Sequence, residues 1–229
     1  MTKVRDVSFV ALAAFSAMLG LAGNVDAEDA LPTIVTLGDS YINSGGVAPT
    51  ESFATKLKSG LNAAGHPVTI AEVGYTGTSK RGLAWLAESK DGLDLQANPA
   101  NHVVIVELGQ NDCARIDLDH TRANLDQILS ILAQKRVPVL VVGTAAYGYC
   151  SSTLSAGHGA DYAEPFSKMF SELATKHGDL LYVDFKEGVT GHRELLQADN
   201  DHPNAAGDAI IVRNMLPMVE ALLAQVQPH

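Results

Sequence analysis

The 229-residue sequence has few cysteines, few aromatic residues and little positive charge. Two cysteines are too few for a small disulfide-held scaffold or for a zinc site with four thiolates. Lys and Arg number 16 against 26 Asp and Glu, and the net charge of −10 argues against a nucleic-acid partner and against charge-based binding to anionic lipid. Hydrophobic residues at 46% and charged residues at 18% exclude a disordered chain. We therefore expect a folded protein with a sizeable core.

Signature motifs of several enzyme classes are absent as well. The sequence contains no G-x-x-x-x-G-K phosphate loop, no G-x-G-x-x-G dinucleotide fingerprint and no H-E-x-x-H zinc helix. It also lacks the S-x-x-K of penicillin-binding proteins and the G-x-S-x-G nucleophile elbow of ordinary α/β-hydrolases. Any chemistry must therefore come from a different arrangement of residues.

The N-terminus has the pattern of a secretory signal peptide. A basic start precedes an apolar stretch at 7–22, and Val25-Asp26-Ala27 fits a cleavage site after Ala27. The stretch is short for the roughly 30 Å of hydrocarbon that a membrane anchor, the alternative, would cross. We predict a signal peptide at 1–27, a single domain at 28–229, and export to a periplasm or out of the cell. We expect no stable membrane insertion after cleavage, and the acidic surface favours a monomer.

Apolar strands alternate with amphipathic helices along the rest of the chain. Near-continuous apolar runs such as His102–Leu108 are typical of strands buried on both faces of a parallel sheet. Right-handed crossovers then place helices on both faces, which predicts a three-layer α/β/α sandwich with a five-stranded, flavodoxin-like parallel sheet. The expected strands are Ile34–Leu37, Val68–Val73, His102–Leu108, Val137–Val142 and Leu180–Phe185. The expected helices are 51–64 with Thr50 as its cap, 79–87, 119–135, 162–177 and 204–226.

Four short segments lie at the ends of these elements, where parallel sheets bind ligands. Gly38-Asp39-Ser40 follows the first strand, and the N–H of a serine at a helix start is suited to stabilising an anion. Gly74-Tyr75-Thr76-Gly77-Thr78-Ser79 follows the second strand, and Gly109-Gln110-Asn111-Asp112 follows the third. Asp199-Asn200-Asp201-His202 precedes the last helix. Taken singly, each segment can be an ordinary turn or helix cap.

The last segment can arrange a base for the serine. Residues i and i+3 of a tight turn share a face, so Asp199 can accept a proton from one ring nitrogen of His202 while the other faces Ser40. Asp201 is expected to point elsewhere. A serine hydroxyl needs such a base to act as a nucleophile.

In this order, the four segments resemble the SGNH/GDSL hydrolase family over essentially the whole chain after the signal peptide. The likeness is closest to its secreted esterase, thioesterase and lysophospholipase branch. The resemblance implies that Ser40 is the nucleophile, that Asp199 and His202 complete a catalytic triad, and that no metal or cofactor is needed. It also implies an oxyanion hole formed by Ser40, Gly77 and Asn111.

Two departures from the family pattern accompany the match. Glu72 and Thr76 stand where the block N-x-G-x-S-G-x-T has Asn and Ser, so Gly74 remains an alternate to Gly77 as oxyanion donor. The first block reads GDSY, with Tyr41 in place of Leu. This change follows the nucleophile and leaves the chemistry untouched.

Further residues near the strand ends are candidates for other roles. The substrate pocket is expected to be lined by Tyr41, Tyr75, Tyr147 and Tyr149. In an oxidising compartment Cys113 and Cys150 are expected to pair, with two free thiols as the alternative.

Three more features have competing interpretations. Ser79 is a rival nucleophile, because it also follows a glycine at a helix start. A metal cluster at Asp117, Asp119 and His120 is the alternative to simple capping of the following helix. Trp85 is expected in the core or half-buried rather than as a clamp on the acyl group.

We therefore expect a serine esterase acting on carboxylic esters or thioesters, such as acyl lipids, lysophospholipids and small aryl or alkyl esters. The substrate would be a small molecule or an acyl lipid. One alternative is a carbohydrate O-acetylesterase or acetyltransferase of the same fold. The other is a non-catalytic binding module on a hydrolase fold, which would be expected to have a broken triad, whereas every triad position is filled here.

Overall fold

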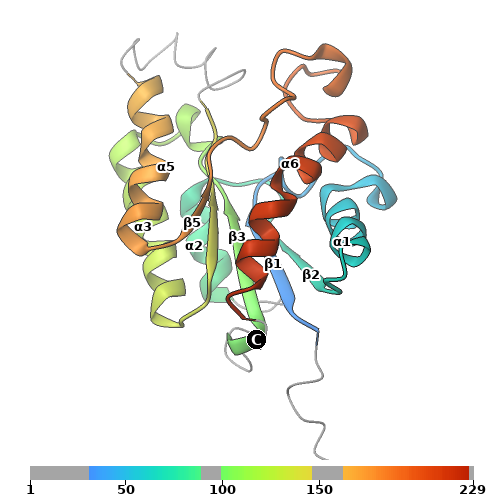
Figure 1. Ribbon diagram of the computed structural model, residues 1–229. Coiled ribbons are helices and arrows are strands. Elements are labelled where there is room, and N and C mark those ends of the chain that lie inside the picture. Colours follow the sequence, from blue (N-terminus) through green and yellow to red (C-terminus); the bar gives the residue numbers. More distant parts are fainter. Residues whose placement is uncertain (1–30, 89–98, 146–161, 227–229) are drawn as a thin grey trace, which may run out of the picture. The chain divides into compact units, whose positions relative to one another are not determined.

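A parallel sheet positions the segments that carry the chemistry (Figure 1). The computed structural model describes residues 31–88, 99–145 and 162–226. Within them, five strands pair in the order β2-β1-β3-β4-β5, all parallel. Their bounds are β1 Thr33–Gly38, β2 Thr69–Val73, β3 His102–Glu107, β4 Val139–Val142 and β5 Leu180–Tyr182. The predicted five-stranded, flavodoxin-like sheet is therefore confirmed.

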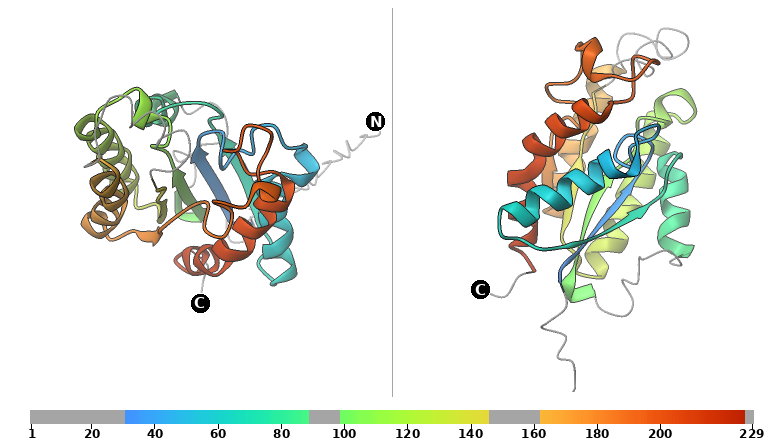
Figure 2. Two further views of the ribbon diagram at one scale, coloured as in Figure 1. Left: turned by 90° about the horizontal axis from the view of Figure 1, so that it is seen from above. Right: turned by 90° about the vertical axis from the view of Figure 1, so that its right-hand side faces the viewer.

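Helices cover both faces of the sheet, as Figure 2 shows. They are α1 Phe53–Ala63, α2 Ser79–Glu88, α3 Leu118–Gln134, α5 Ala163–His177 and α6 Ala205–Leu223. One face packs against α1 and α6, and the other packs against α2, α3 and α5. The predicted three layers are thus present, because each crossover helix buries its apolar stripe on the sheet. None of the described helices is long and apolar enough to cross a membrane.

Strand β3 shows why both faces need cover. Its side chains alternate between two hydrophobic clusters: Val104 and Val106 join the cluster under α2, α3 and α5, whereas Val103 and Ile105 join the one under α1 and α6. All four are almost completely buried. Both faces of the strand are therefore covered by helices. Because all five strands are parallel, their carboxyl ends lie together at one end of the sheet.

Capping residues set several helix ends. Asp117 begins α3 by accepting from the His120 N–H at 2.9 Å, so the capping interpretation of this group is confirmed. Asn204 caps α6 and Gly178 closes α5 in the left-handed conformation. The predicted cap Thr50 is wrong: it lies in a 3₁₀ turn, and Ser52 caps α1 through a bond from the Thr55 N–H.

The fifth strand is shorter than predicted. It ends at Tyr182 rather than Phe185, because Val183 turns its side chain to solvent and is 75% exposed. The Phe185 N–H still donates to the Gly143 carbonyl at 2.9 Å, which keeps the following segment beside β4. The predicted cleavage site, Tyr147, Tyr149 and Cys150 lie outside the described residues.

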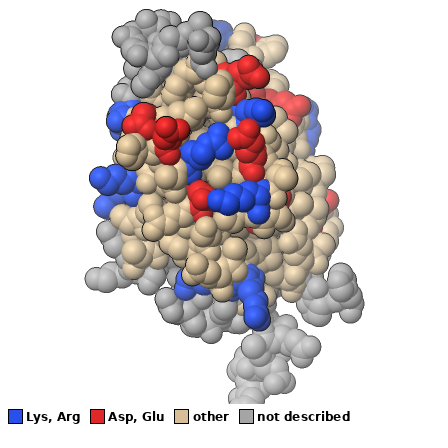
Figure 3. Space-filling model, turned by 90° about the vertical axis from the view of Figure 1, so that its left-hand side faces the viewer, with Lys and Arg blue, Asp and Glu red and all other residues tan. Residues whose placement is uncertain are grey.

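Charged side chains of both signs alternate on the outer surface of α3 and α5 (Figure 3). Arg122 pairs with Glu172 at 2.7 Å, and Asp126 accepts from Lys176 at 2.7 Å and from His177 at 2.6 Å. Hydrogen bonds from Lys176 and His177 lower the pKa of Asp126. Because most of these groups are solvated, each pair adds at most about 1 kcal/mol, and the apolar seam beneath holds the two helices together.

A buried carboxyl group ties α6 to the segment after β1. Asp208, in the first turn of α6, is fully buried and accepts from the Ser44 hydroxyl at 2.9 Å, while the Ser44 oxygen accepts from the Phe53 N–H at 2.7 Å. Its second carboxyl oxygen, Oδ1, has no hydrogen-bond partner. Burial raises the pKa of Asp208 to about 6.

This shift predicts a pH-dependent stability. Between pH 4 and 6 the unfolded chain ionises position 208 while the folded protein keeps its proton, so the stabilisation present at low pH is lost as pH rises. Asp208→Asn cannot ionise, and its free energy of unfolding should gain about 2 kcal/mol relative to wild type between pH 4 and pH 7. Urea denaturation at both pH values measures this. Asp119→Asn, at an exposed position of α3, is the control, and parallel profiles for wild type and Asp208→Asn would contradict the assignment.

Candidate active site

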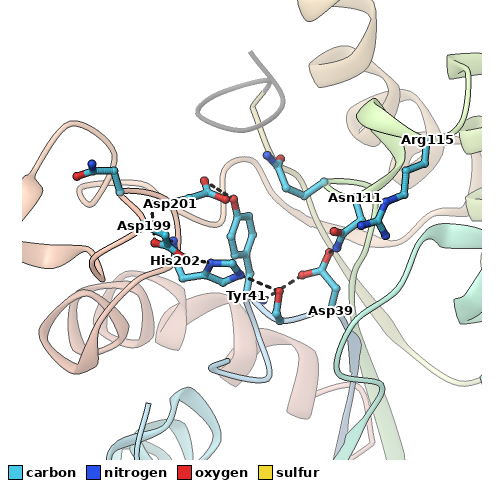
Figure 4. A pocket seen from close by; sticks show the side chains of 10 residues that line it. Asp39, Tyr41, Asn111, Arg115, Asp199, Asp201 and His202 are labelled. Atoms are coloured by element: carbon cyan, nitrogen blue, oxygen red, sulfur yellow. Dashed lines mark hydrogen bonds and ion pairs between the residues drawn. The ribbon is translucent and has the colours of Figure 1, made fainter. Parts of the chain in front are cut away.

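Ser40, His202 and Asp199 form a continuous row of hydrogen bonds at the carboxyl edge of the sheet (Figure 4). The Ser40 Oγ lies 2.8 Å from His202 Nε2, and His202 Nδ1 lies 2.7 Å from Asp199 Oδ2. Serine and histidine are 162 positions apart in the sequence, and the fold brings them together. The structure thus unites the three residues that the sequence proposes as a triad.

A tight turn after β1 presents Ser40. The Asn43 N–H donates to the Asp39 carbonyl at 3.1 Å and the Gly45 N–H to the Ser40 carbonyl at 2.8 Å, which reverses the chain directly after the strand. Gly38 permits this turn, because a Cβ atom there would collide with the Ile42 side chain and lie 2.9 Å from the Glu107 carbonyl oxygen.

A second turn orients the histidine. Asp199 Oδ1 accepts from the backbone N–H groups of Asp201 at 3.0 Å and His202 at 3.1 Å, which leaves Oδ2 facing the ring. Asn200 adopts a positive φ of 63° between them. Partial burial acts to raise the pKa of Asp199, but the hydrogen bonds from Asp201 and His202 outweigh it and lower the pKa below its usual value. Asp199 therefore stays ionised beside the imidazole.

Asn111 lies on the other side of the serine, and a buried carboxylate holds its amide. Its Nδ2 donates to Asp39 Oδ2 at 2.7 Å, and Asp39 Oδ1 accepts from the Tyr41 N–H at 3.0 Å. Burial raises the pKa of Asp39 to about 6. It raises the pKa of neighbouring Glu107 well above its usual value, and the charge of Asp39 raises it further, which favours the protonated form of Glu107.

The sequence did not predict the pairing of the Asp39 and Glu107 carboxyl groups. In the sequence interpretation Asp39 could be only part of a turn, and Glu107 had no role. The one available signal was Glu107 itself, an acidic residue in the otherwise apolar run of β3.

The segment after β2 is held against both neighbouring loops. Asn43 Nδ2 donates to the Gly74 carbonyl at 2.6 Å, and a Cβ on Gly74, whose φ is +91°, would collide with the Gly38 carbonyl. Ser79 is completely buried; its N–H donates to Asp112 at 2.8 Å and its hydroxyl also bonds Asp112. Ser79 is therefore inaccessible to substrate, which removes it as a rival nucleophile.

A cleft of about 580 Å³ opens over the hydrogen-bonded row. Of the described residues, those lining it are Asp39, Ser40, Tyr41, Gln110, Asn111, Arg115, Asp199, Asn200, Asp201 and His202. Gln110 and Asn200 belong to the predicted segments but were given no role there, and Arg115, four positions after Asn111, was not predicted.

Among the proposed oxyanion donors, Gly77 and its alternate Gly74 do not line this cleft, whereas Ser40 and Asn111 do. The predicted pocket tyrosines differ from one another. Tyr41 borders the cleft but is 2% exposed, so its ring lies in the protein interior. Tyr75 is 57% exposed and is not among the described residues that line the cleft. Trp85 is partly buried against the core, as expected.

The comparison with known families agrees with this geometry. The model of the GDSL-like Lipase/Acylhydrolase family matches residues 36–210. The chain belongs to this family. Esterase TesA of Pseudomonas aeruginosa is 30% identical over 201 residues, which is 86% of this chain and 92% of TesA.

Two solved structures extend the likeness. A crystal structure of TesA has a TM-score of 0.71 and 26% identity, covering 83% of this chain and 99% of that one. The structure of AlinE4, described as an SGNH-hydrolase family esterase, has a TM-score of 0.64 and 28% identity, covering 87% and 98%. The predicted family, hydrolase class and fold are therefore confirmed for this GDSL-type acylhydrolase.

Proposed function

We propose that the protein is a serine esterase that hydrolyses carboxylic esters or thioesters through an acyl-enzyme on Ser40. The observation that carries this proposal is the row from Ser40 through His202 to Asp199, open to a cleft. Family membership and the esterase relatives support the same reaction class.

The reaction begins with proton transfer across the 2.8 Å between Ser40 Oγ and His202 Nε2. As His202 takes the proton, the serine oxygen bonds to the carbonyl carbon of the ester, and the carbonyl π electrons move onto its oxygen. The imidazolium then protonates the leaving alcohol or thiol as its bond to carbon breaks. Water, deprotonated by His202, repeats the sequence and releases the acid. The ionised carboxylate of Asp199 accepts from His202 Nδ1 and stabilises the charged ring throughout.

Negative charge on the tetrahedral intermediate requires donors fixed in advance. The Ser40 N–H, the Gly77 N–H, with Gly74 as alternate, and the Asn111 side chain fill this role in the proposal. One N–H of the Asn111 amide is engaged by Asp39 at 2.7 Å, and the second N–H of the same group remains to donate to the oxyanion. Because Asp39 holds the amide before substrate arrives, no reorganisation is needed during the reaction.

The proposed substrates are acyl lipids, lysophospholipids and small aryl or alkyl esters, and the proposed location is a periplasm or the exterior of the cell. The family and the esterase relatives support small-molecule esters, and the N-terminal pattern at 1–27 supports export. Carbohydrate O-acetyl groups are the alternative substrates. We also propose a monomer in which Cys113 and Cys150 are bridged.

A panel of p-nitrophenyl esters and acyl thioesters of increasing chain length tests the proposal. Wild type should hydrolyse them, whereas Ser40→Ala should lose both turnover and labelling by a fluorophosphonate probe, because it lacks the attacking oxygen. Ser171→Ala on α5 is the control and should retain both. Labelling that persists in Ser40→Ala would reject the nucleophile. A strict preference for acetyl esters together with polysaccharide binding would favour the carbohydrate substrate.

Asn111→Ala tests the oxyanion hole. Loss of one such donor lowers kcat by about 10²–10³. Since the donor acts on charge that exists only in the transition state, KM should change little. Steady-state kinetics separate the two constants, and Asn62→Ala, at an exposed position of α1, is the control. Equal losses in kcat and in substrate affinity would contradict the assigned role.

The proposed disulfide would hold the loop that carries Asn111. Cys113 is buried two positions after Asn111, and its Sγ lies 2.9 Å from the Gln110 carbonyl oxygen. Reduction should lower the free energy of unfolding by about 3–4 kcal/mol and reduce esterase activity. Thiol titration of the denatured protein before and after reduction measures the bridge directly. Two reactive thiols without any reductant would show that it is absent.

A further inference from the structure

Three polar side chains lie together beside the Ser40–His202 pair, outside the row that reacts. Lys186 Nζ lies 2.9 Å from Asp201 Oδ1 and donates to the Tyr41 hydroxyl at 3.1 Å, and that hydroxyl donates to Asp201 Oδ1 at 2.6 Å. The exposed fractions are 4% for the Lys186 side chain, 17% for that of Asp201 and 2% for Tyr41. Three groups thus satisfy one another in a closed triangle largely removed from water.

The triangle joins the two turns that the reaction needs. Tyr41 directly follows Ser40, and Asp201 directly precedes His202, so the bond between their side chains spans the gap that the proton crosses. In Figure 4 the Tyr41 ring stands beside the imidazole with its hydroxyl directed at Asp201. The Tyr41 and His202 rings meet edge to face at 5.2 Å. Lys186 reaches both turns from the segment after β5 and also donates to the Asp201 carbonyl at 3.3 Å.

We infer that Tyr41, Asp201 and Lys186 form a clamp that sets the separation between Ser40 Oγ and His202 Nε2, and that they are positioning residues for the proposed reaction. The inference rests on the proposed function for its kinetic consequences. Its structural content, a fixed distance between two turns, stands independently of catalysis.

The charges of the three groups support a clamp rather than a chance contact. A lysine so deeply buried is tolerated only when paired, and Lys186 has Asp201 as its partner, with its ammonium 4.5 Å from the centre of the Tyr41 ring. Burial and the Asp201 carboxylate raise the pKa of Tyr41 well above its usual value, so its hydroxyl remains a donor. Asp39 and Glu107, the other acids near this ring, act in the same direction.

The clamp depends on the residue by which this chain departs from its family motif. A leucine after the nucleophile, as in GDSL, offers no hydroxyl, and Asp201 would lose its 2.6 Å bond. The ring also stacks on Phe185 at 6.1 Å, so its position is set by the core as well.

Two other contacts tie the segment after Ser40 to the C-terminal part of the chain. Gln197 Nε2 donates to the Gly45 carbonyl at 2.6 Å, and Ser44 bonds Asp208 at 2.9 Å. Loss of the clamp should therefore displace the histidine without separating the turns. A misplacement of about 1 Å can cost on the order of 10² in rate.

Two variants test the clamp without leaving Lys186 or Asp201 as a buried charge without its counter-ion. Tyr41→Phe keeps the ring and removes only the hydroxyl. The double variant Lys186→Met/Asp201→Leu removes both charges together and leaves an apolar contact. Their matched controls are Tyr182→Phe, which removes a hydroxyl bonded to Glu187 elsewhere in the core, and Lys176→Met, which removes a lysine from an ion pair on α5.

We expect kcat to fall about tenfold in Tyr41→Phe and about 10²-fold in the double variant, with KM within threefold of wild type. Fluorophosphonate labelling of Ser40 should slow by the same factors, since it requires the Ser40–His202 pair but no ester substrate. The controls should stay within twofold. Variants that are folded, as thermal melting shows, and that keep wild-type kcat and labelling rates would overturn the inference.

A crystal structure of each variant separates this test from that of the proposed function. The Ser40 Oγ to His202 Nε2 distance should exceed hydrogen-bonding range in the double variant and remain 2.8 Å in the controls. If wild type neither hydrolyses esters nor labels at Ser40, the proposed function fails, while a lengthened distance still supports the clamp. An unchanged distance in the double variant would reject the clamp whatever the kinetics show.

Discussion

In the proposed reaction a proton passes directly between Ser40 Oγ and His202 Nε2, so the 2.8 Å between these atoms is the constraint that the rest of the site must satisfy. The two residues come from opposite ends of the described chain. A parallel sheet buried on both faces supplies the solution, because its strands deliver their carboxyl ends to one edge. Strand β1 and helix α6 place the two turns at that end of the sheet, and local contacts then fix the distance between Ser40 and His202.

Acidic side chains make many of these local contacts, and their environments shift their pKa values in different directions. Asp199 is stabilised as an anion by two backbone N–H groups and the imidazole. Asp39 lies in the interior and holds Asn111, while burial and the charge of Asp39 raise the pKa of Glu107. An ionised Glu107 would place a second negative charge beside the Asp39 carboxylate in the interior. The raised pKa of Glu107 limits this repulsion.

The sequence predicted those features that depend on local pattern. Apolar runs and helical spacing predicted the strands, the helices and their layers, and a spacing of three predicted the Asp199–His202 contact. Features that depend on distant partners were missed. Nothing near Lys186 in the sequence indicates that it meets Tyr41, a residue 145 positions away. The error at Thr50 has a related cause, because Ser52 is an equally good cap and the choice depends on the 3₁₀ turn that Pro49 begins.

The Tyr41–Asp201–Lys186 triangle also limits the evolutionary routes open to such a sequence. Starting from a leucine at position 41, a lysine acquired alone at 186 would be a buried charge without a counter-ion, and an aspartate acquired alone at 201 would be equally costly. A tyrosine gained alone would stack its ring on Phe185, but its buried hydroxyl would have neither Asp201 nor Lys186 as a partner. Each member of the triangle therefore depends on the other two, and a sequence that keeps only part of it buries a polar group without its partner.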